Sequence, residues 1–342
     1  MRVGIDARKF ADFGIGTYIR GLLRGLVELN TGDDYVAFAP AGAQLPSGIE
    51  HVIVDAPHYS LRELLVVGRA ANRANLDVFH APHYVVPFTN VPVVVTIHDL
   101  IHLHQPLADP LARVYARTML RRAMRKAAVV LTVSHAVKGD LERELGATNV
   151  IVTPNGVDAR PSAPRERTHF LCVGNDKPHK NVGTLIDAFA RVRNEIGDAL
   201  LVLVGAPFEQ YRGMSGIETR GFVSDDELSS LYASAIALVM PSDEEGFGLP
   251  AAEAMAHATP VITSNAAALV EITGDAALHV DARDANALAA AMLRVSSDGE
   301  LRAQLARNGT ARAAEFTWRR CAEATRNAYE SARIRGTSWN VG

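Results

Sequence analysis

The chain has 342 residues, more than one hydrophobic core usually organises, so we expect two domains. Its formal net charge of −3 provides no overall basic field, which argues against a protein that coats nucleic acid and makes any anion site a local feature. Two cysteines, Cys172 and Cys321, are too few and too far apart for a disulfide framework or a thiolate metal site, and they favour a reducing compartment.

Short apolar runs of strand length recur along the chain, and each is followed by a turn and a helical pattern. No run reaches the roughly 20 apolar residues of a membrane span, so we expect a cytoplasmic protein that can touch the inner face of a membrane only peripherally. Strands that alternate with helices predict parallel sheets with right-handed crossovers, and thus an α/β protein with two Rossmann-like, doubly wound domains. The expected strands lie in 2–6, 35–40, 77–82, 91–99 and 128–134 of the first half and in 169–175, 199–207, 236–242, 260–265 and 277–282 of the second.

A linker is expected within residues 152–170, where three prolines, an Asn-Gly pair and clustered charges interrupt both periodicities. We therefore place an N-terminal domain at 1–160 and a C-terminal domain at 165–318. Helical patterns follow at 285–306 and at 319–336, and the last of these is amphipathic enough to pack on a part that is already folded.

A basic stripe is expected on a helix in the first half, where arginines recur at i,i+4 spacing. One interpretation is an ordinary solvated face before the strand at 128–134. The other is attraction to anionic lipid headgroups or a lipid phosphate. The stripe consists of Arg113, Arg117, Arg121 and Arg125.

The segment DFGIGTYIRGLL places Gly14 and Gly16 between the first strand and a helix, where a tight loop can approach a diphosphate or a transferred sugar. A plain strand-to-helix turn is the alternative. A dinucleotide fold would need a third glycine at position 19, which is Ile19, so a hydride-transfer cofactor is not expected.

Three histidines lie at and after the end of the strand at 91–99: His98 ends that strand directly, and His102 and His104 follow it. A metal site is not expected from them, because no Cys or Glu completes a recognisable ligand spacing. A hydrogen-bonded structural role for His98 stays open.

The stretch SDEEGFGLPAAEAMA, residues 242–256, sets Glu245 and Glu253 eight positions apart across a glycine-rich turn. The turn follows a strand, and ligands bind beyond the carboxyl ends of parallel strands. Pro250 suits a first helical turn, which leaves the N–H groups of residues 246–249 at the positive end of a helix. We expect Glu245 on the turn and Glu253 in the first turn of the helix, both accepting hydrogen bonds from hydroxyls of a ligand. The alternative is that Glu253 only complements the helix dipole while Glu245 is solvated.

This pattern resembles the E-x7-E signature of the group 1 retaining nucleotide-sugar glycosyltransferases, a family with the GT-B fold that includes bacterial α-mannosyltransferases and glycogen synthases. The resemblance continues, in the family's order, through GIGTY, VTIHDL, VTPNGVD, LCVGNDKPHKNVGTLIDAFA and RGFVSDDELSSLYASA. It implies two Rossmann-like domains that face each other across a cleft, with the helix at 319–336 crossing back onto the N-terminal domain.

The resemblance also implies roles for single residues. His98 would face the reacting sugar, Lys180 would meet the diphosphate, and Glu245 would position the sugar hydroxyls. The family's usual arginine is Asn175 in this chain, so Lys177 or a protonated His179 would supply a second positive charge. The implied donor-binding residues are Gly14, Gly16, Lys177, Lys180, Phe222, Gly246, Phe247, Gly248, Leu249 and, for the ribose, Glu253.

The implied reaction is hexose transfer from a nucleoside diphosphate sugar with retention of configuration. GDP-mannose is the expected donor, while UDP-glucose, UDP-N-acetylglucosamine and dTDP-rhamnose stay open. The acceptor would be a glycan or lipid-linked saccharide of bacterial surface-polysaccharide assembly. No two aspartates are separated by a single residue, so no metal and no cofactor are expected. A nucleotide-sugar epimerase and an inactive glycan-binding scaffold are the rival interpretations.

Overall fold

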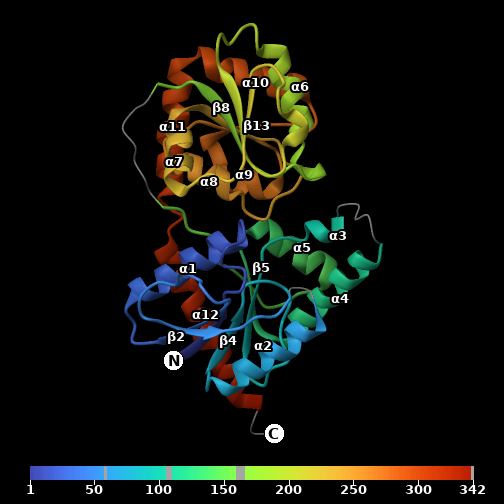
Figure 1. Cartoon of the computed structure of the whole chain (residues 1–342), viewed down its shortest axis with the longest axis vertical. Coiled ribbons are helices and arrows are strands. Elements are labelled where there is room, and N and C mark those ends of the chain that lie inside the picture. Colours follow the sequence, from blue (N-terminus) through green and yellow to red (C-terminus); the bar gives the residue numbers. More distant parts are fainter. Residues whose placement is uncertain (58–59, 105–109, 159–165, 340–342) are drawn as a thin grey trace. The chain divides into compact units, whose positions relative to one another are not determined.

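The computed structural model describes residues 1–57, 60–104, 110–158 and 166–339. The chain forms two compact units, the first from Met1–Gly156 with Trp318–Gly342 and the second from Val157–Thr317 (Figure 1). The chain therefore leaves the first unit near Gly156 and returns to it at Trp318. Most of the predicted linker, residues 159–165, lies outside the described residues.

The first unit is built on a seven-stranded parallel sheet in the order β3-β2-β1-β4-β5-β6-β7. The strand order reverses between β1 and β4, which makes the sheet doubly wound. Its strands are β1 (Arg2–Asp6), β2 (Asp34–Ala39), β3 (Ile49–Ile53), β4 (Val78–Ala81), β5 (Val93–Ile97), β6 (Ala127–Thr132) and β7 (Val150–Val152).

Helices cover both faces of this sheet. Side chains of α1 and α12 share one hydrophobic cluster with strand residues, and α2, α4 and α5 contribute to another. Figure 1 shows α12, in red, beside α1, in blue. The helices are α1 (Ile15–Leu29), α2 (Leu61–Arg73), α3 (Ile101–His104), α4 (Pro110–Lys126), α5 (His135–Leu145) and α12 (Trp318–Trp339).

Close packing joins α12 to α1, because two glycines of α1 make room for Trp318. A Cβ atom on Gly21 would lie 2.1 Å from Trp318 Cε2, and one on Gly25 would lie 2.6 Å from the carbonyl oxygen of Trp318. A buried hydrogen-bond chain adds to this contact: Tyr329 on α12 lies 2.7 Å from His80 Nδ1, and His80 Nε2 lies 2.8 Å from Thr96 Oγ1. Helix α12 is thus part of the core of the first unit.

The second unit has a six-stranded parallel sheet in the order β10-β9-β8-β11-β12-β13, which reverses between β8 and β11. Its strands are β8 (His169–Gly174), β9 (Leu200–Gly205), β10 (Ile217–Arg220), β11 (Ala235–Met240), β12 (Val261–Ser264) and β13 (Ala277–Val280). The prediction of two Rossmann-like α/β domains is confirmed.

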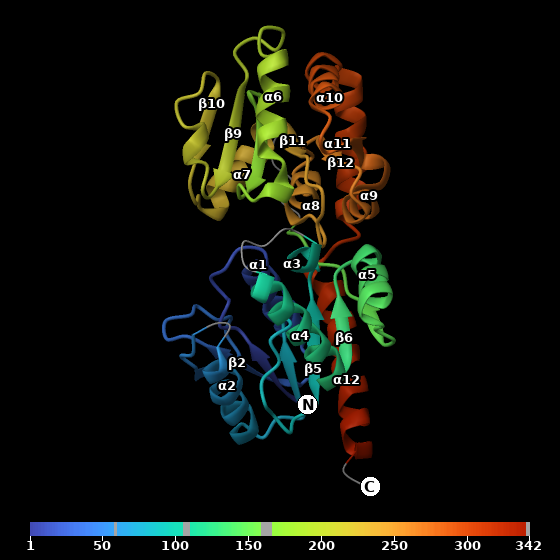
Figure 2. The ribbon, with the colours of Figure 1, turned by 90° about the vertical axis from the view of Figure 1, so that its right-hand side faces the viewer.

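Six helices of the second unit are α6 (Val182–Val192), α7 (Asp225–Ser234), α8 (Leu249–Ala256), α9 (Ala267–Thr273), α10 (Ala285–Ser297) and α11 (Gly299–Ala313). Helices α6 and α10 pack against each other over the sheet (Figure 2). The helical pattern at 285–306 divides at Asp298, whose carboxylate accepts a hydrogen bond from the N–H of Leu301 at 2.9 Å and so begins a new helix.

All ten expected strands are present, and the sequence missed β3, β7 and β10, each of which lies at the edge of its sheet. The residues of these three strands are mostly exposed or half-buried, so they do not form the buried apolar run by which the other strands were predicted. Within the described part of the chain, no helix combines the length and the apolarity that crossing a bilayer requires.

Candidate functional site

The centre of the second unit brings together the loops after β8 and β11. These strands are neighbours where the strand order reverses, and ligands of doubly wound sheets bind at that point, beyond the carboxyl ends of the strands. Two hydrogen bonds join the loops: the N–H of Asp243 donates to the carbonyl of His179 at 2.7 Å, and the amide of Asn181 donates to the carbonyl of Pro241 at 3.0 Å. The two loops therefore form one structure.

Lys180 and Glu245 meet across these loops. Lys180 ends a short 3-10 turn, Pro178–Lys180, which is closed by the left-handed Asn181 with φ of 49°. Its Nζ atom lies 2.5 Å from Glu245 Oε1, and the two side chains are 19% and 10% exposed. The sequence placed these residues in one site, and the structure brings them into direct contact. A partly exposed ammonium group here can bind a phosphate, and the carboxylate can accept hydrogen bonds from hydroxyls.

The two residues considered for a second positive charge differ in exposure. Lys177 precedes the 3-10 turn with an exposed side chain, whereas His179, inside that turn, is buried. Asn175 accepts a hydrogen bond from the N–H of Lys177 at 3.3 Å and so shapes this end of the loop. Of these two groups, only Lys177 presents an exposed cation.

The glycine-rich turn leads into α8 as the sequence predicts, with Pro250 in its first turn. Gly248 has φ of 91°, and a Cβ atom there would lie 2.5 Å from Leu269 Cδ2, so a larger residue is excluded. The first hydrogen bonds of the helix run from Ala251 and Ala252 to the carbonyl of Gly248, which places the N–H of Leu249 ahead of them, at the positive end of the helix. An anion can bind at this end.

The two aromatic residues of the implied donor site, Phe222 and Phe247, differ in exposure. Phe247 is buried and packs edge-on against Phe316, with ring centroids 5.5 Å apart, so only its backbone can meet a ligand. Phe222 follows β10, at the same edge of the sheet as the loops described above, and is 64% exposed.

Glu253 lies in the second turn of α8, as the fifth residue of the helix, and the expectation of a place in the first turn is wrong. Complementing the helix dipole therefore does not account for it, because that effect is confined to the first turn. Its Oε2 atom accepts a hydrogen bond from the hydroxyl of Tyr232 at 2.8 Å. Burial, and then the charge of Glu253, raise the pKa of Tyr232 well above its usual value, so this hydroxyl remains a donor.

Sequence reasoning missed Tyr232, which lies on α7, 21 positions before Glu253. Its ring stacks on His257 at a centroid distance of 5.3 Å, and His257 Nε2 in turn lies 2.6 Å from the hydroxyl of Ser229. The SSLYAS pattern shows only that one face of α7 is apolar, so no signal in the sequence identified the contact. These contacts fix the orientation of the Glu253 carboxylate.

In the first unit, the two glycines of the GIG segment have different environments. Gly14 is exposed with φ of 61°, and a Cβ atom there would meet nothing within 4 Å. Gly16 is buried in α1, and a Cβ atom there would lie 2.7 Å from the carbonyl oxygen of Phe10. Gly16 is thus required by the close approach of its own loop, while the backbone of Gly14 is accessible.

His98 directly follows β5, as expected. Its Nε2 atom donates to the carbonyl of Pro82 at 3.0 Å, and its ring packs edge-on against Tyr18 with centroids 4.8 Å apart. Burial lowers its pKa, so the imidazole is neutral and Nδ1 is its acceptor nitrogen. The other two histidines contact different residues: His104 lies 2.9 Å from the Glu144 carboxylate, and His102 packs on Tyr84.

A buried charged cluster occupies the reversal point of the first sheet, and the sequence analysis did not identify it. Arg8 Nη2 lies 2.6 Å from Asp6 Oδ2 and 2.6 Å from Glu63 Oε1, and His83 Nε2 lies 3.7 Å from Asp6. Burial acts to raise the pKa of Asp6, but the charge and hydrogen bonds of Arg8, together with the charge of His83, outweigh it, and the pKa is lowered. Asp6, Glu63 and His83 have the residue types of a metal site, yet the Arg8 guanidinium already supplies positive charge to both carboxylates.

Comparison with known proteins matches both halves of the chain. Residues 158–312 match the family described as glycosyl transferases group 1, and residues 14–160 match the one described as glycosyltransferase family 4. O-antigen chain mannosyltransferase B of Escherichia coli is 30% identical over 286 residues, which cover 74% of each chain. The MMP alpha-(1->4)-mannosyltransferase of Mycolicibacterium hassiacum is 38% identical over 223 residues, 59% of this chain and 54% of that protein. Sucrose-phosphate synthase from Thermosynechococcus elongatus has a similar fold, with a TM-score of 0.82 at 21% identity over 98% of this chain and 99% of that one.

Proposed function

Because the chain belongs to the group 1 glycosyltransferases, we propose that it transfers mannose from GDP-mannose to a glycan or lipid-linked saccharide, with retention of configuration. The observation that carries the proposal is the contact between Lys180 and Glu245 beside the start of α8. It puts a cation, a carboxylate and a helix N-terminus at one ligand-binding edge.

The proposed donor pose follows from these groups. The diphosphate lies on Lys180 and the N–H of Leu249, Lys177 adds the second positive charge, and Gly246 and Gly248 allow close approach of the backbone. Glu245 accepts hydrogen bonds from the sugar hydroxyls, and Glu253, fixed by Tyr232, accepts them from the ribose. Binding of the diphosphate takes Lys180 from its ion pair and leaves the Glu245 carboxylate available to the sugar.

The proposed reaction takes place on one face of the sugar. The bond between the anomeric carbon and the diphosphate oxygen breaks while the acceptor oxygen bonds to that carbon from the same side. The acceptor proton passes to the departing phosphate oxygen, so the products are a glycoside and the nucleoside diphosphate. Lys180 and the N-terminus of α8 stabilise the charge that develops on the leaving group, and we infer that no metal ion takes part.

His98 is assigned to the transferred sugar by the family resemblance. As a neutral imidazole with Nε2 already donating to Pro82, it offers an acceptor nitrogen to a sugar hydroxyl and adds no charge. The backbone of Gly14 is proposed to approach the same end of the donor.

The choice of mannose rests on the two relatives named above, both mannosyltransferases. A role in assembling surface polysaccharide is proposed from the O-antigen relative. UDP-glucose, UDP-N-acetylglucosamine and dTDP-rhamnose are the alternative donors.

A donor panel tests these assignments. Thermal stability is measured with GDP, UDP and dTDP, because binding to the folded state alone raises stability with the ratio of ligand concentration to Kd. Donors that carry the preferred base are then incubated with and without acceptor, and the anomeric configuration of the product is read by NMR. A stronger shift with UDP rejects GDP-mannose, an inverted product rejects retention, and a new nucleotide sugar formed without acceptor would show an epimerase.

Peripheral contact with anionic membrane is also proposed, because Arg113, Arg117, Arg121 and Arg125 are all exposed on α4. Val114 among them is 63% exposed, so this surface combines positive charge with apolar area. Each basic residue near an anionic surface contributes about 1 kcal/mol. Co-sedimentation with vesicles at low and high salt tests it, and failure to bind anionic vesicles at low salt rejects it.

A further inference from the structure

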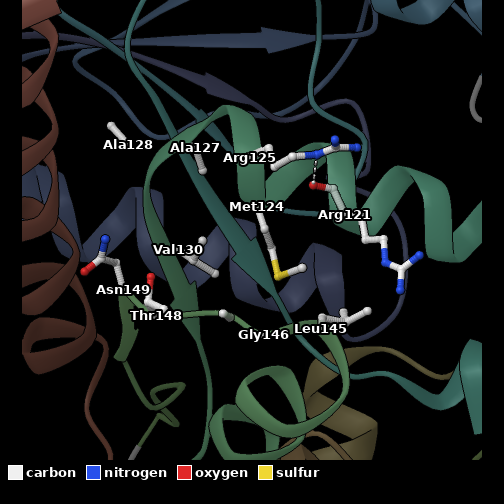
Figure 3. A pocket seen from close by; sticks show the side chains of 11 residues that line it. Arg121, Met124, Arg125, Ala127, Ala128, Val130, Leu145, Gly146, Thr148 and Asn149 are labelled. Atoms are coloured by element: carbon white, nitrogen blue, oxygen red, sulfur yellow. Dashed lines mark hydrogen bonds between the residues drawn. The ribbon is translucent and has the colours of Figure 1, made fainter.

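A cavity of about 530 Å³ lies in the first unit where β6 and β7 begin, at the edge of the sheet opposite to the loops after β1 and β5. It is half open to solvent and is lined by the C-terminal half of α4, the start of β6 and the connection from α5 to β7 (Figure 3). Its volume falls in the range of roughly 300 to 1,000 Å³ that is usual for small-molecule sites. None of the residues discussed above as donor-binding or catalytic lines it.

The lining divides into a basic side and an apolar side. Arg121 and Arg125, the last two arginines of the α4 stripe, form the basic side. The side chain of Met124 points from α4 toward Leu145 (Figure 3). Val130 and Leu145 continue the apolar side. None of the eleven described lining residues is acidic, so the side chains that line the cavity carry net positive charge.

The walls are held by their own hydrogen bonds. Arg125 Nε donates to the carbonyl of Arg121 at 3.3 Å, which holds its guanidinium group along α4. Helix α5 ends at the left-handed Gly146, whose N–H donates to the carbonyl of Glu142 at 3.2 Å. On the opposite side, the N–H of Val130 donates to the carbonyl of Asn149 at 3.4 Å. The cavity is therefore formed without a ligand, which lowers the cost of binding one.

We propose that this cavity binds the phosphodiester headgroup of an anionic lipid. The phosphate oxygens accept hydrogen bonds from Arg121 and Arg125, since guanidinium groups bind phosphate with matching geometry. The carbons next to the phosphate pack against Met124, Val130 and Leu145. The inference rests on the proposed membrane contact of α4, because the same stripe of arginines that would face the membrane forms one side of the cavity. The cavity would thus add a defined lipid-binding site to the general electrostatic attraction between α4 and an anionic membrane.

Two double variants of the full chain test the site. Arg121→Gln with Arg125→Gln removes two charges at the cavity, and the matched control, Arg113→Gln with Arg117→Gln, removes two charges from the same helix outside it. The probe is short-chain phosphatidylglycerol below its micelle concentration, measured by isothermal titration. We expect the cavity pair to weaken this binding about 10- to 100-fold, as losing hydrogen bonds to a charged group does, while the control stays within about 2-fold of wild type. Equal effects of the two pairs would overturn the site and leave only general electrostatic attraction.

Three further measurements complete the test: a variant that fills the cavity, a comparison of the lipid with inorganic phosphate, and a control that each variant is folded. Met124→Trp fills the cavity without changing the charge and should also abolish lipid binding, whereas retained binding overturns the assignment. Inorganic phosphate should bind much more weakly than the lipid, and equal affinity would show that the site takes a free anion. Urea unfolding followed by tryptophan fluorescence confirms that each variant is folded, because Trp318 packs in the core of the first unit, which carries the substitutions. If wild type binds the short-chain lipid but no nucleoside diphosphate, the donor proposal fails and the lipid site does not.

Discussion

Both units have a cluster of charged side chains at the reversal point of a doubly wound sheet, but they use it differently. In the first unit, the side chains of Asp6, Arg8 and Glu63 are at most 3% exposed and form ion pairs with one another. In the second unit, the side chains of Lys180 and Glu245 form a single ion pair that remains 19% and 10% exposed. The fold puts charged residues at the same place in both units. The buried cluster of Asp6, Arg8 and Glu63 is a structural brace, whereas the more exposed pair of Lys180 and Glu245 can exchange its ion pair for a ligand.

The largest expected effect comes from breaking the brace. Arg8→Met leaves two buried carboxylates without their cation, which should reduce the free energy of unfolding by about 3 to 5 kcal/mol. The matched control is Arg20→Met in the same unit, since Arg20 bonds only the Phe10 carbonyl and the Thr17 hydroxyl among the described partners, and it should cost about 1 kcal/mol. Urea denaturation measures both, followed by fluorescence, because both tryptophans, Trp318 and Trp339, lie in α12. Equal losses would mean that the cluster is no special brace.

Acid should weaken the first unit through His80. Burial lowers the pKa of His80 to about 3 from 6.5, so the unfolded chain binds its proton at a higher pH than the folded one. The contribution of neutral His80 to the free energy of unfolding is therefore fully present above pH 6.5. It is lost as the pH falls toward 3, by up to about 1.4 kcal/mol per pH unit. His80→Gln should reduce this slope in fluorescence-detected unfolding measured at successive pH values. An unchanged slope would show that other groups cause the acid sensitivity.

The partly exposed pair of Lys180 and Glu245 should behave in the opposite way to the brace. Lys180→Ala should weaken binding of nucleoside diphosphate by about 1.5 to 3 kcal/mol, as loss of a charged hydrogen bond does, and should leave stability within about 1 kcal/mol of wild type. Lys138→Ala is the control, because Lys138 pairs with Glu142 on the surface of α5. Titration calorimetry and urea denaturation supply the two measurements. Large destabilisation without loss of affinity would make Lys180 a structural residue.

A smaller effect is expected at Tyr232. Tyr232→Phe removes the hydrogen bond to Glu253 and should raise the donor KM by about 3- to 10-fold with little change in kcat, because a ribose contact is equally strong in ground and transition states. Tyr329→Phe, a buried tyrosine of the first unit, should leave the donor KM unchanged. In a double-mutant cycle with Glu253→Gln, the two effects should not add. Additive effects would show that Tyr232 acts independently of Glu253.

The smallest expected effect is that of metal removal. If Lys180 and the helix N-terminus stabilise the leaving diphosphate, then EDTA should not change kcat. Activity that disappears in EDTA and returns with Mg²⁺ or Mn²⁺ would contradict the proposed mechanism.

The central strands were predictable because each is a buried apolar run, and the GIG and E-x7-E segments were predictable because glycines, proline and carboxylates have strong positional preferences. The contacts that the sequence did not predict join residues that are distant along the chain. Glu63 lies 55 positions from Arg8, and Tyr232 lies 21 positions from Glu253. Nothing in a single sequence pairs them, since the sheet and the helices on it decide which of them meet. The turn of α8 that holds Glu253 was misplaced because the helix already begins at Leu249, one residue before Pro250, so that Glu253 is its fifth residue.

The route of the chain also determines the order in which the protein can be completed on the ribosome. The first unit receives α12, with Trp318 against Gly21 and Tyr329 against His80, only after the whole second unit has been synthesised. The second unit can therefore finish folding first, while the apolar surface of α1 that packs against α12 is still exposed to solvent. A nascent chain that stalls before Trp318 would expose that surface, and this makes the stalled product a natural substrate for chaperones.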